Sequence, residues 1–165
     1  MILRTIVLAL GLCGALVAAQ FPAYSQQYLQ RLGGAVAALD KVVADFDHSA
    51  AAQGMTRSAA LAQMRGTAFV DARRLDMQRT FARHTRLRAD LALLEGHGPF
   101  MRAYFAARLT DREIATGAFA AFRPALPLSF AGALFAFFGF LVTVAAVNMC
   151  VALCGAWGRK PQQAA

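Results

Sequence analysis

Four arginines lie close together in the sequence, and their positive charges could bind an anion: Arg79, Arg83, Arg86 and Arg88. A guanidinium group binds phosphate through its charge and its paired N–H donors. At a membrane surface, each such side chain adds about 1 kcal/mol of attraction to anionic lipids. The run therefore predicts contact with lipid headgroups.

The same run has two other interpretations. The first is a solvated helix face with local ion pairs, Asp76 with Arg79 and Arg86 with Asp90. The second is nucleic-acid binding, which the sequence does not favour, because no zinc-ligand spacing, recognition-helix motif or aromatic platform accompanies the arginines. We therefore expect no nucleic-acid partner.

No group of residues in the sequence predicts catalysis. The histidines have no ligand-like spacing to one another or to cysteine: His48, His84 and His97. The three cysteines lie in apolar runs, and their odd number gives no disulfide framework. Motifs for a serine nucleophile, a phosphate loop or a zinc protease are missing from the sequence. We expect a protein that is not an enzyme and that holds no cofactor and no metal.

The composition indicates a membrane protein. Of 165 residues, 58% are hydrophobic and 16% charged, with a net charge of +8, whereas an average soluble domain is about 45–50% apolar and about 25% charged. Two apolar segments, residues 5–19 and 128–157, stand out. A membrane-spanning helix needs about 20 apolar residues, so the second segment predicts a transmembrane helix. Residues 1–21 predict either a transmembrane anchor or a cleavable signal sequence.

Residues 22–95 predict an antiparallel helical hairpin. Apolar residues recur at steps of three and four, as in a packed helix or a coiled coil, at Tyr28, Leu32, Val36, Leu39, Val43 and Phe46. Gly54 breaks this helix, Thr56 is a good N-cap, and a second helix is expected over residues 57–95. A turn near residue 52 would pair Asp47 with Arg57, Asp40 with Arg65, and Arg31 with Asp71. Gly33 and Gly34 indicate either close approach of another backbone or a flexible joint.

Residues 96–127 predict short helices at the membrane interface. Gly96–Pro99 ends the preceding helix, and the aromatic residues and arginines of 99–109 are typical of an interfacial helix. Residues 110–113, Thr-Asp-Arg-Glu, form a capping box with Thr110 as the expected N-cap. Residues 158–165 are expected to be a polar tail.

The second span carries small residues at helical spacing: Gly132, Ala136, Gly139 and Thr143. Such a face lets two helices approach closely in lipid, and Gly11, Gly14, Ala15 and Ala18 supply a comparable face on the first segment. Asn148 lies away from this face. Because a polar amide at membrane depth is costly, we expect Asn148 to contact a helix of a membrane-protein partner or of a second copy.

Basic residues near the outer ends of the spans predict the topology. Arg4 precedes the first apolar segment, and Arg159 and Lys160 follow the second. Both termini are therefore expected in the cytoplasm, with residues 22–127 in the periplasm. The fold expected from the whole sequence is an all-α membrane protein, two transmembrane helices joined by a helical hairpin and interfacial helices.

Three blocks of sequence carry a family resemblance: FPAYSQQYLQRLGGAVAALD, GMTRSAALAQM and FRPALPLSFAGALFAFFG. They resemble a proteobacterial inner-membrane protein family known only as a domain of unknown function. The resemblance implies location in the bacterial inner membrane and transfers no activity. Together with the residues, it predicts a non-enzymatic accessory subunit or scaffold of a membrane complex, or alternatively a protein that binds anionic lipids or organises the membrane.

Overall fold

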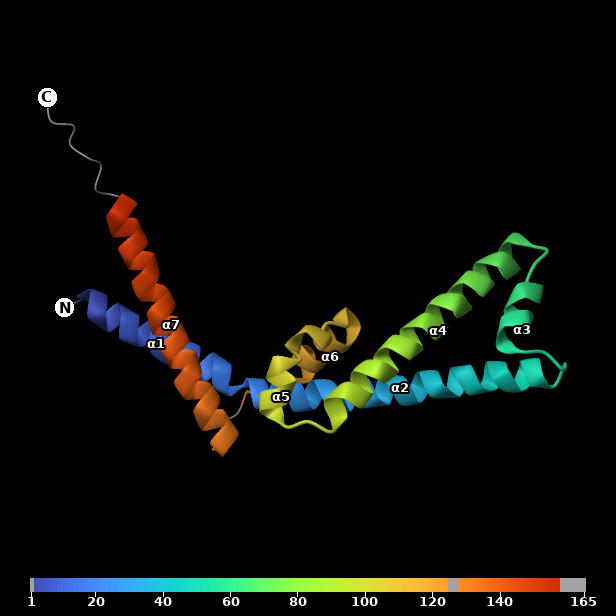
Figure 1. Ribbon diagram of the computed structural model, residues 1–165, viewed down its shortest axis with the longest axis horizontal. Coiled ribbons are helices and arrows are strands. Elements are labelled where there is room, and N and C mark those ends of the chain that lie inside the picture. Colours follow the sequence, from blue (N-terminus) through green and yellow to red (C-terminus); the bar gives the residue numbers. More distant parts are fainter. Residues whose placement is uncertain (1, 125–127, 158–165) are drawn as a thin grey trace, which may run out of the picture. The chain divides into compact units, whose positions relative to one another are not determined.

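The computed structural model describes residues 2–124 and 128–157, with side chains as far as residue 154. Every regular element in this part of the chain is a helix, which confirms the all-α prediction (Figure 1). The predicted tail of residues 158–165 and the end of the predicted interfacial segment, residues 125–127, lie outside the described residues. The chain divides into a terminal unit, Met1–Tyr24 with Arg123–Ala165, and a central unit, Ser25–Phe122.

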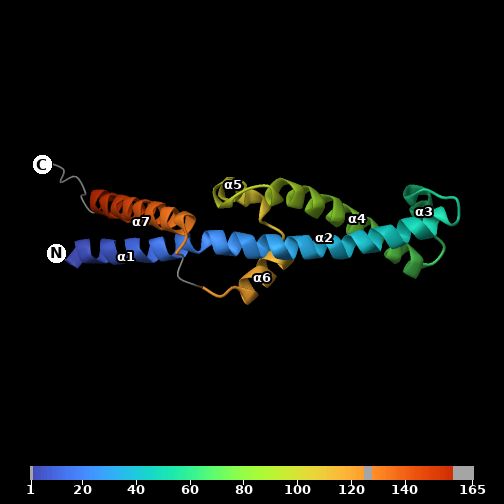
Figure 2. The same ribbon diagram turned by 90° about the horizontal axis from the view of Figure 1, so that it is seen from below.

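The terminal unit consists mainly of two apolar helices, α1 (Ile2–Ala19) and α7 (Phe130–Trp157), which pack against each other. They run antiparallel, so the start of α1 and the end of α7 lie on the same side of the pair (Figure 2). Two helices, one starting at Ile2 and one covering Phe130–Cys154, are long and apolar enough to cross a membrane.

Small residues on both helices allow α1 and α7 to approach closely. A Cβ atom added at Gly139 would overlap the Ala18 side chain and lie 2.8 Å from the carbonyl oxygen of Gly14. A Cβ atom added at Gly14 would overlap the Thr143 side chain. Near the end of the contact, the rings of Phe21 and Phe135 lie 5.3 Å apart. The packing therefore depends on glycine at positions 14 and 139.

The central unit is built on α2 (Phe21–Ala51), whose residues from Ser25 onward belong to it. The unit contains two further helices, α4 (Ala68–Glu95) and α6 (Arg112–Ala121). It also contains three shorter elements, α3 (Arg57–Gln63), α5 (Pro99–Tyr104) and the 3₁₀ turn η1 (Ala106–Arg108). Helix α4 runs back towards the beginning of α2 at an angle to it, and α3 lies where the two helices separate (Figure 1).

The apolar stripe predicted on α2 faces the interior of the central unit. Tyr28, Leu32, Val36 and Val43 are buried, while Leu39 and Phe46 are half-buried. At the α3 end, Val43 clusters with Met77 and Phe81 of α4, and Phe46 and Leu61 pack against that cluster. The ring of Phe46 meets the ring of Phe81 edge-on at 5.1 Å. The spacing of three and four residues therefore identified the core face of α2 correctly.

One predicted helix is two helices in the structure. Residues 57–95 were expected to be continuous, but the chain leaves the helical conformation between α3 and α4. Gly66 has a φ of +120°, which only glycine adopts readily. The next residue, Thr67, caps α4 by accepting a hydrogen bond from the Val70 N–H at 3.3 Å. Gly54 (φ +68°) and Thr56, the N-cap of α3, lie where the sequence predicted them.

The longer connection between α2 and α4 changes which charges meet. Arg57 donates to Asp47, Nε to Oδ1 at 2.7 Å, as predicted. The pairing of Asp40 with Arg65 is wrong, because Asp40 contacts His84 at 2.7 Å instead. Asp71 likewise pairs with Arg74 of its own helix, 3.7 Å away, and not with Arg31. The connection runs from residue 52 to residue 67, so the expected turn at residue 52 paired α2 with the wrong part of the chain.

The two adjacent glycines of α2, Gly33 and Gly34, are not at a close contact with another backbone. A Cβ atom added at Gly33 or Gly34 would meet nothing within 4 Å. No atom from another part of the described chain therefore lies against either Cβ position. The interpretation of close approach at these glycines is therefore wrong.

Candidate functional site

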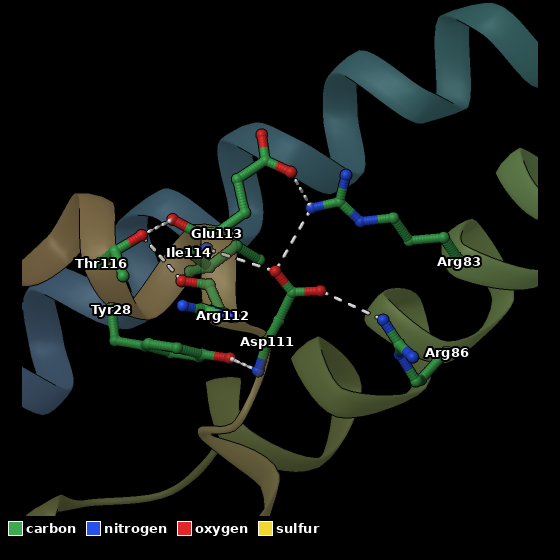
Figure 3. A network of polar contacts seen from close by, with 8 residues as sticks. All are labelled: Tyr28, Arg83, Arg86, Asp111, Arg112, Glu113, Ile114 and Thr116. Atoms are coloured by element: carbon green, nitrogen blue, oxygen red, sulfur yellow. Dashed lines mark hydrogen bonds and ion pairs between the residues drawn. The ribbon is translucent and has the colours of Figure 1, made fainter.

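The most connected polar site of the central unit is centred on Asp111, at the start of α6 (Figure 3). The Asp111 side chain caps this helix, because Oδ1 accepts a hydrogen bond from the Ile114 N–H at 3.2 Å. The capping box was predicted one residue too early, with Thr110 as the N-cap. Glu113 also departs from the box, since it faces Arg83 at 2.7 Å.

Two arginines of α4 hold the Asp111 carboxylate from the other side. Arg83 and Arg86 are three residues apart and so project from the same face of α4. Nη2 of Arg83 lies 3.3 Å from Oδ1 of Asp111, and Nη2 of Arg86 lies 3.1 Å from Oδ2 (Figure 3). The Asp111 side chain is only 9% exposed. Two charge-assisted contacts thus compensate for the partial burial of one carboxylate.

A tyrosine of α2 completes this group. The hydroxyl oxygen of Tyr28 accepts a hydrogen bond from the Asp111 N–H at 3.2 Å. Tyr28 is only 1% exposed, and its aromatic ring belongs to the core of the unit. We call Tyr28, Arg83, Arg86, Asp111 and Glu113 the Asp111 cluster. It joins α2, α4 and α6, helices that are far apart in the sequence.

The electrostatics of the Asp111 cluster favour the ionised carboxylate. Burial works against the charge of Asp111, but the hydrogen bond from Ile114 and the nearby Arg83 and Arg86 outweigh it and lower its pKa. Burial also works against the charge of Arg83, whose pKa is nevertheless raised by Asp111 and Glu113. The two groups therefore stabilise each other's charged form.

The lowered pKa makes the stability of the central unit dependent on pH. The carboxylate contributes its full stabilisation above the pKa of the unfolded chain, about 3.9, and loses it as the pH falls through the lower pKa of the folded state. We expect Asp111→Asn to be less stable than the parent protein at pH 7, and we expect this difference in stability to shrink as the pH is lowered to 3. Thermal unfolding of both proteins over this range measures the difference. A deficit that stays constant over this range would contradict the ion pairs.

A second set of ion pairs surrounds an open groove of about 730 Å³ between α2 and α4. His84, itself buried, contacts Asp40 through Nε2 at 2.7 Å, and Arg88 lies 3.7 Å from the same carboxylate. Arg57 bonds to Asp47, which lowers the pKa of that carboxyl, and lies over the Phe81 ring at 4.8 Å. Two carboxylates, Asp40 and Asp47, therefore line the groove, and each lies next to an arginine.

The four arginines predicted to meet lipid headgroups all have carboxylate partners in the structure. Arg83 and Arg86 belong to the Asp111 cluster, Arg79 lies 3.7 Å from Asp76 and Arg88 lies 3.7 Å from Asp40. Of the two local ion pairs proposed as the alternative, Asp76 with Arg79 is present. Arg86 with Asp90 is wrong, because Asp90 pairs with Arg108 of η1 at 3.3 Å.

The predicted packing residues of the second span lie mostly towards α1. Gly139 and Thr143 contact Gly14 and Ala18, as described above. Gly132 is buried and Ala136 half-buried. Asn148, by contrast, is exposed on α7.

Comparison with known proteins gives one match. A model of the family described as Protein of unknown function (DUF2937) matches residues 2–160. The chain belongs to this family. No curated protein and no solved structure matches the chain. The predicted resemblance to a family known only as a domain of unknown function is therefore confirmed.

Sequence reasoning about this DUF2937 member missed the central role of Asp111. The signals available were the capping box at residues 110–113 and the spacing of Arg83 and Arg86 on one helix face. Neither says that the two meet, because 28 and 25 residues separate the arginines from Asp111. Among the residues that the structure describes, no three histidine, cysteine, aspartate or glutamate side chains are grouped to hold a metal ion.

Proposed function

We propose that this member of the DUF2937 family is a non-enzymatic integral membrane protein that acts as an accessory subunit or scaffold of a bacterial inner-membrane complex. In this proposal residues 1–21 and 128–157 cross the membrane. Residues 22–127 lie in the periplasm, with the segment 96–127 at the interface, and both termini are cytoplasmic.

The observation that carries the membrane part of the proposal is the exposure of apolar side chains on α1 and α7. In the most apolar 18-residue stretch of each candidate span, only 17% (first span) and 6% (second span) is buried. The core helix of a water-soluble protein would be largely buried. Side chains such as Leu12 (61% exposed), Val142 (67%) and Phe138 (58%) instead face outwards, which suits a hydrocarbon solvent.

The scaffold part of the proposal rests on how the central unit uses its charges. Asp111 joins α6 to α4, Arg108 joins η1 to α4 through Asp90, and Arg102 donates to Gln26 of α2 at 2.6 Å. These contacts link separate helices and so define the shape of the unit. A unit whose polar groups hold it in one shape is suited to presenting a surface to a partner.

The test is to express the full chain in a bacterium, extract membranes at alkaline pH, and purify the protein in mild detergent for mass spectrometry. The proposal expects the chain to stay in the alkali-washed membrane and to co-purify with a stoichiometric membrane-protein partner or a second copy. Release into the alkaline supernatant would exclude the spans. A monomer without partner in several mild detergents would exclude the scaffold.

A second candidate function, binding of anionic lipids, is favoured by the exposure of the arginines. The side chains of Arg79 and Arg88 are 79% and 68% exposed, and each lies 3.7 Å from its carboxylate. Exposed ion pairs of this kind contribute only about 0–1 kcal/mol, so a phosphate group could compete for these arginines.

Lipid binding is tested with purified protein and vesicles. We expect the full chain to retain phosphatidylglycerol more strongly than phosphatidylcholine, and Arg79→Gln/Arg88→Gln to lose roughly 30-fold of that preference, at about 1 kcal/mol for each charge. The matched control is Arg65→Gln/Arg73→Gln, which removes the same charge from two other exposed arginines of the central unit. Equal losses in the two double variants would indicate a general effect of net charge and no lipid site.

A further inference from the structure

We propose that α7 of one copy packs against α7 of a second copy of this chain, with the Asn148 side chains hydrogen-bonded to each other across the contact. This inference rests on the proposed function, because it requires α7 to span the membrane. It goes further in naming the partner and the surface.

The first observation is that Asn148 is exposed and that its side chain has no hydrogen-bond partner among the described residues. In the candidate span Phe130–Cys154 it lies beyond the middle of the helix but well before its end. At 1.5 Å per residue, it would be roughly 9 Å from the centre of a hydrocarbon layer about 30 Å thick. A carboxamide at that depth finds no water, so leaving its donors and acceptor unpaired is costly.

The second observation is that Asn148 belongs to a stripe on the side of α7 turned away from α1. Gly139, which contacts α1, is nine residues before Asn148, and nine residues correspond to two and a half helical turns. Residues at alternating steps of three and four share the Asn148 side, and all are exposed: Phe138, Leu141, Ala145, Asn148 and Ala152. This spacing is that of a helix–helix seam, with small residues next to the asparagine.

The chemistry of the stripe fits a second copy. A carboxamide has both N–H donors and an oxygen acceptor, so two of them satisfy each other. Two copies inserted in the same orientation bring identical residues to the same depth, and a two-fold axis along the membrane normal then places Asn148 opposite Asn148. Apart from Thr143, which faces α1, Asn148 is the only hydroxyl- or amide-bearing residue between Phe130 and Cys154. The seam therefore has a single polar pair to satisfy.

The inference is tested by disulfide cross-linking of the full chain in native membranes, in a background of Cys13→Ala, Cys150→Ala and Cys154→Ala. Leu141→Cys introduces a thiol on the seam, and Leu153→Cys is the control, since Leu153 is 63% exposed but lies about a third of a turn from Leu141 around the helix. We expect oxidation to produce a covalent dimer with Leu141→Cys and little with Leu153→Cys. Adding Asn148→Leu should weaken the dimer roughly 3- to 30-fold, the range for an interhelical hydrogen bond in lipid.

Each result has a distinct meaning. Asn148→Gln, which keeps the carboxamide, should restore part of the cross-linking that Asn148→Leu removes. Equal cross-linking at positions 141 and 153, or no effect of Asn148→Leu, would overturn the seam. Protein that resists alkaline extraction but gives no dimer would refute this inference and leave the membrane proposal intact. Protein released by alkaline extraction would refute both.

Discussion

Gly139→Leu is expected to separate α1 from α7. Even a single added carbon at position 139 would overlap Ala18 and press on the Gly14 carbonyl oxygen, and backbone atoms cannot rotate away as a side chain can. Overpacking of this kind costs about 1–3 kcal/mol, and the loss of close helix contact adds to it. In a titration with sodium dodecyl sulfate in mixed micelles, followed by circular dichroism, the variant should unfold at a clearly lower fraction of the denaturing detergent.

Gly33→Ala is a control for the loss of a helical glycine. It adds a single carbon inside a long helix, and nothing lies within 4 Å of the added atom. Alanine is favoured over glycine in a helix by about 0.5–1 kcal/mol, so this variant should be as stable as the parent or more so. If Gly139→Leu behaved like Gly33→Ala, the close contact of α1 with α7 would be wrong.

The sequence predicted well those features that depend on neighbouring residues. Gly54 ends α2 with a φ that glycine prefers, and Thr56 caps the next helix three residues before the N–H that it accepts from. The pair of Asp47 and Arg57 was also found, because only ten residues separate the two and the turn between them is short. Local backbone preferences are strong enough to be read without knowledge of the rest of the fold.

The predictions that failed depend on how much chain a connection uses. The break between α3 and α4 falls at Gly66 and Thr67, a glycine followed by an N-cap residue, and the prediction of one helix over residues 57–95 ran through both. Once that break is included, α4 starts later than a simple turn at residue 52 allows. Asp40 then meets His84 where the sequence suggested Arg65. An error in one connection thus changes the two predicted pairs whose members are furthest apart in the sequence, Asp40 with Arg65 and Arg31 with Asp71.

The Asp111 cluster also shows that local sequence patterns do not predict long-range contacts. The capping box and the two arginines were each identified, but the box was assigned to Thr110 as the cap, and the arginine partners of the true cap, Asp111, come from another helix. Many exposed aspartates could accept an arginine equally well in the sequence. The hydrogen bond from the Asp111 N–H to the Tyr28 hydroxyl, which holds the start of α6 next to α2, cannot be seen in any local pattern.

Asp111→Ala is expected to be the most damaging substitution of a charged residue in the central unit. It removes the N-cap of α6, which costs about 0.5–2 kcal/mol, and leaves Arg83 and Arg86 without the carboxylate that they share. Each partly exposed ion pair adds up to about 1 kcal/mol. We therefore expect a loss of about 2–3 kcal/mol in the free energy of unfolding, measured by denaturant titration of the detergent-solubilised chain.

Asp111→Asn divides this loss into its two causes. Asparagine caps a helix about as well as aspartate, but it carries no charge for the arginines. The Asn variant should therefore lose only the ion-pair part, and the remaining difference between the Asn and Ala variants is the cap. Asp76→Asn is the control for a general effect of charge, because Asp76 is exposed and its one ion pair, with Arg79, is 3.7 Å long. A loss at Asp76 as large as at Asp111 would show that net charge, and not the junction of α2, α4 and α6, governs stability.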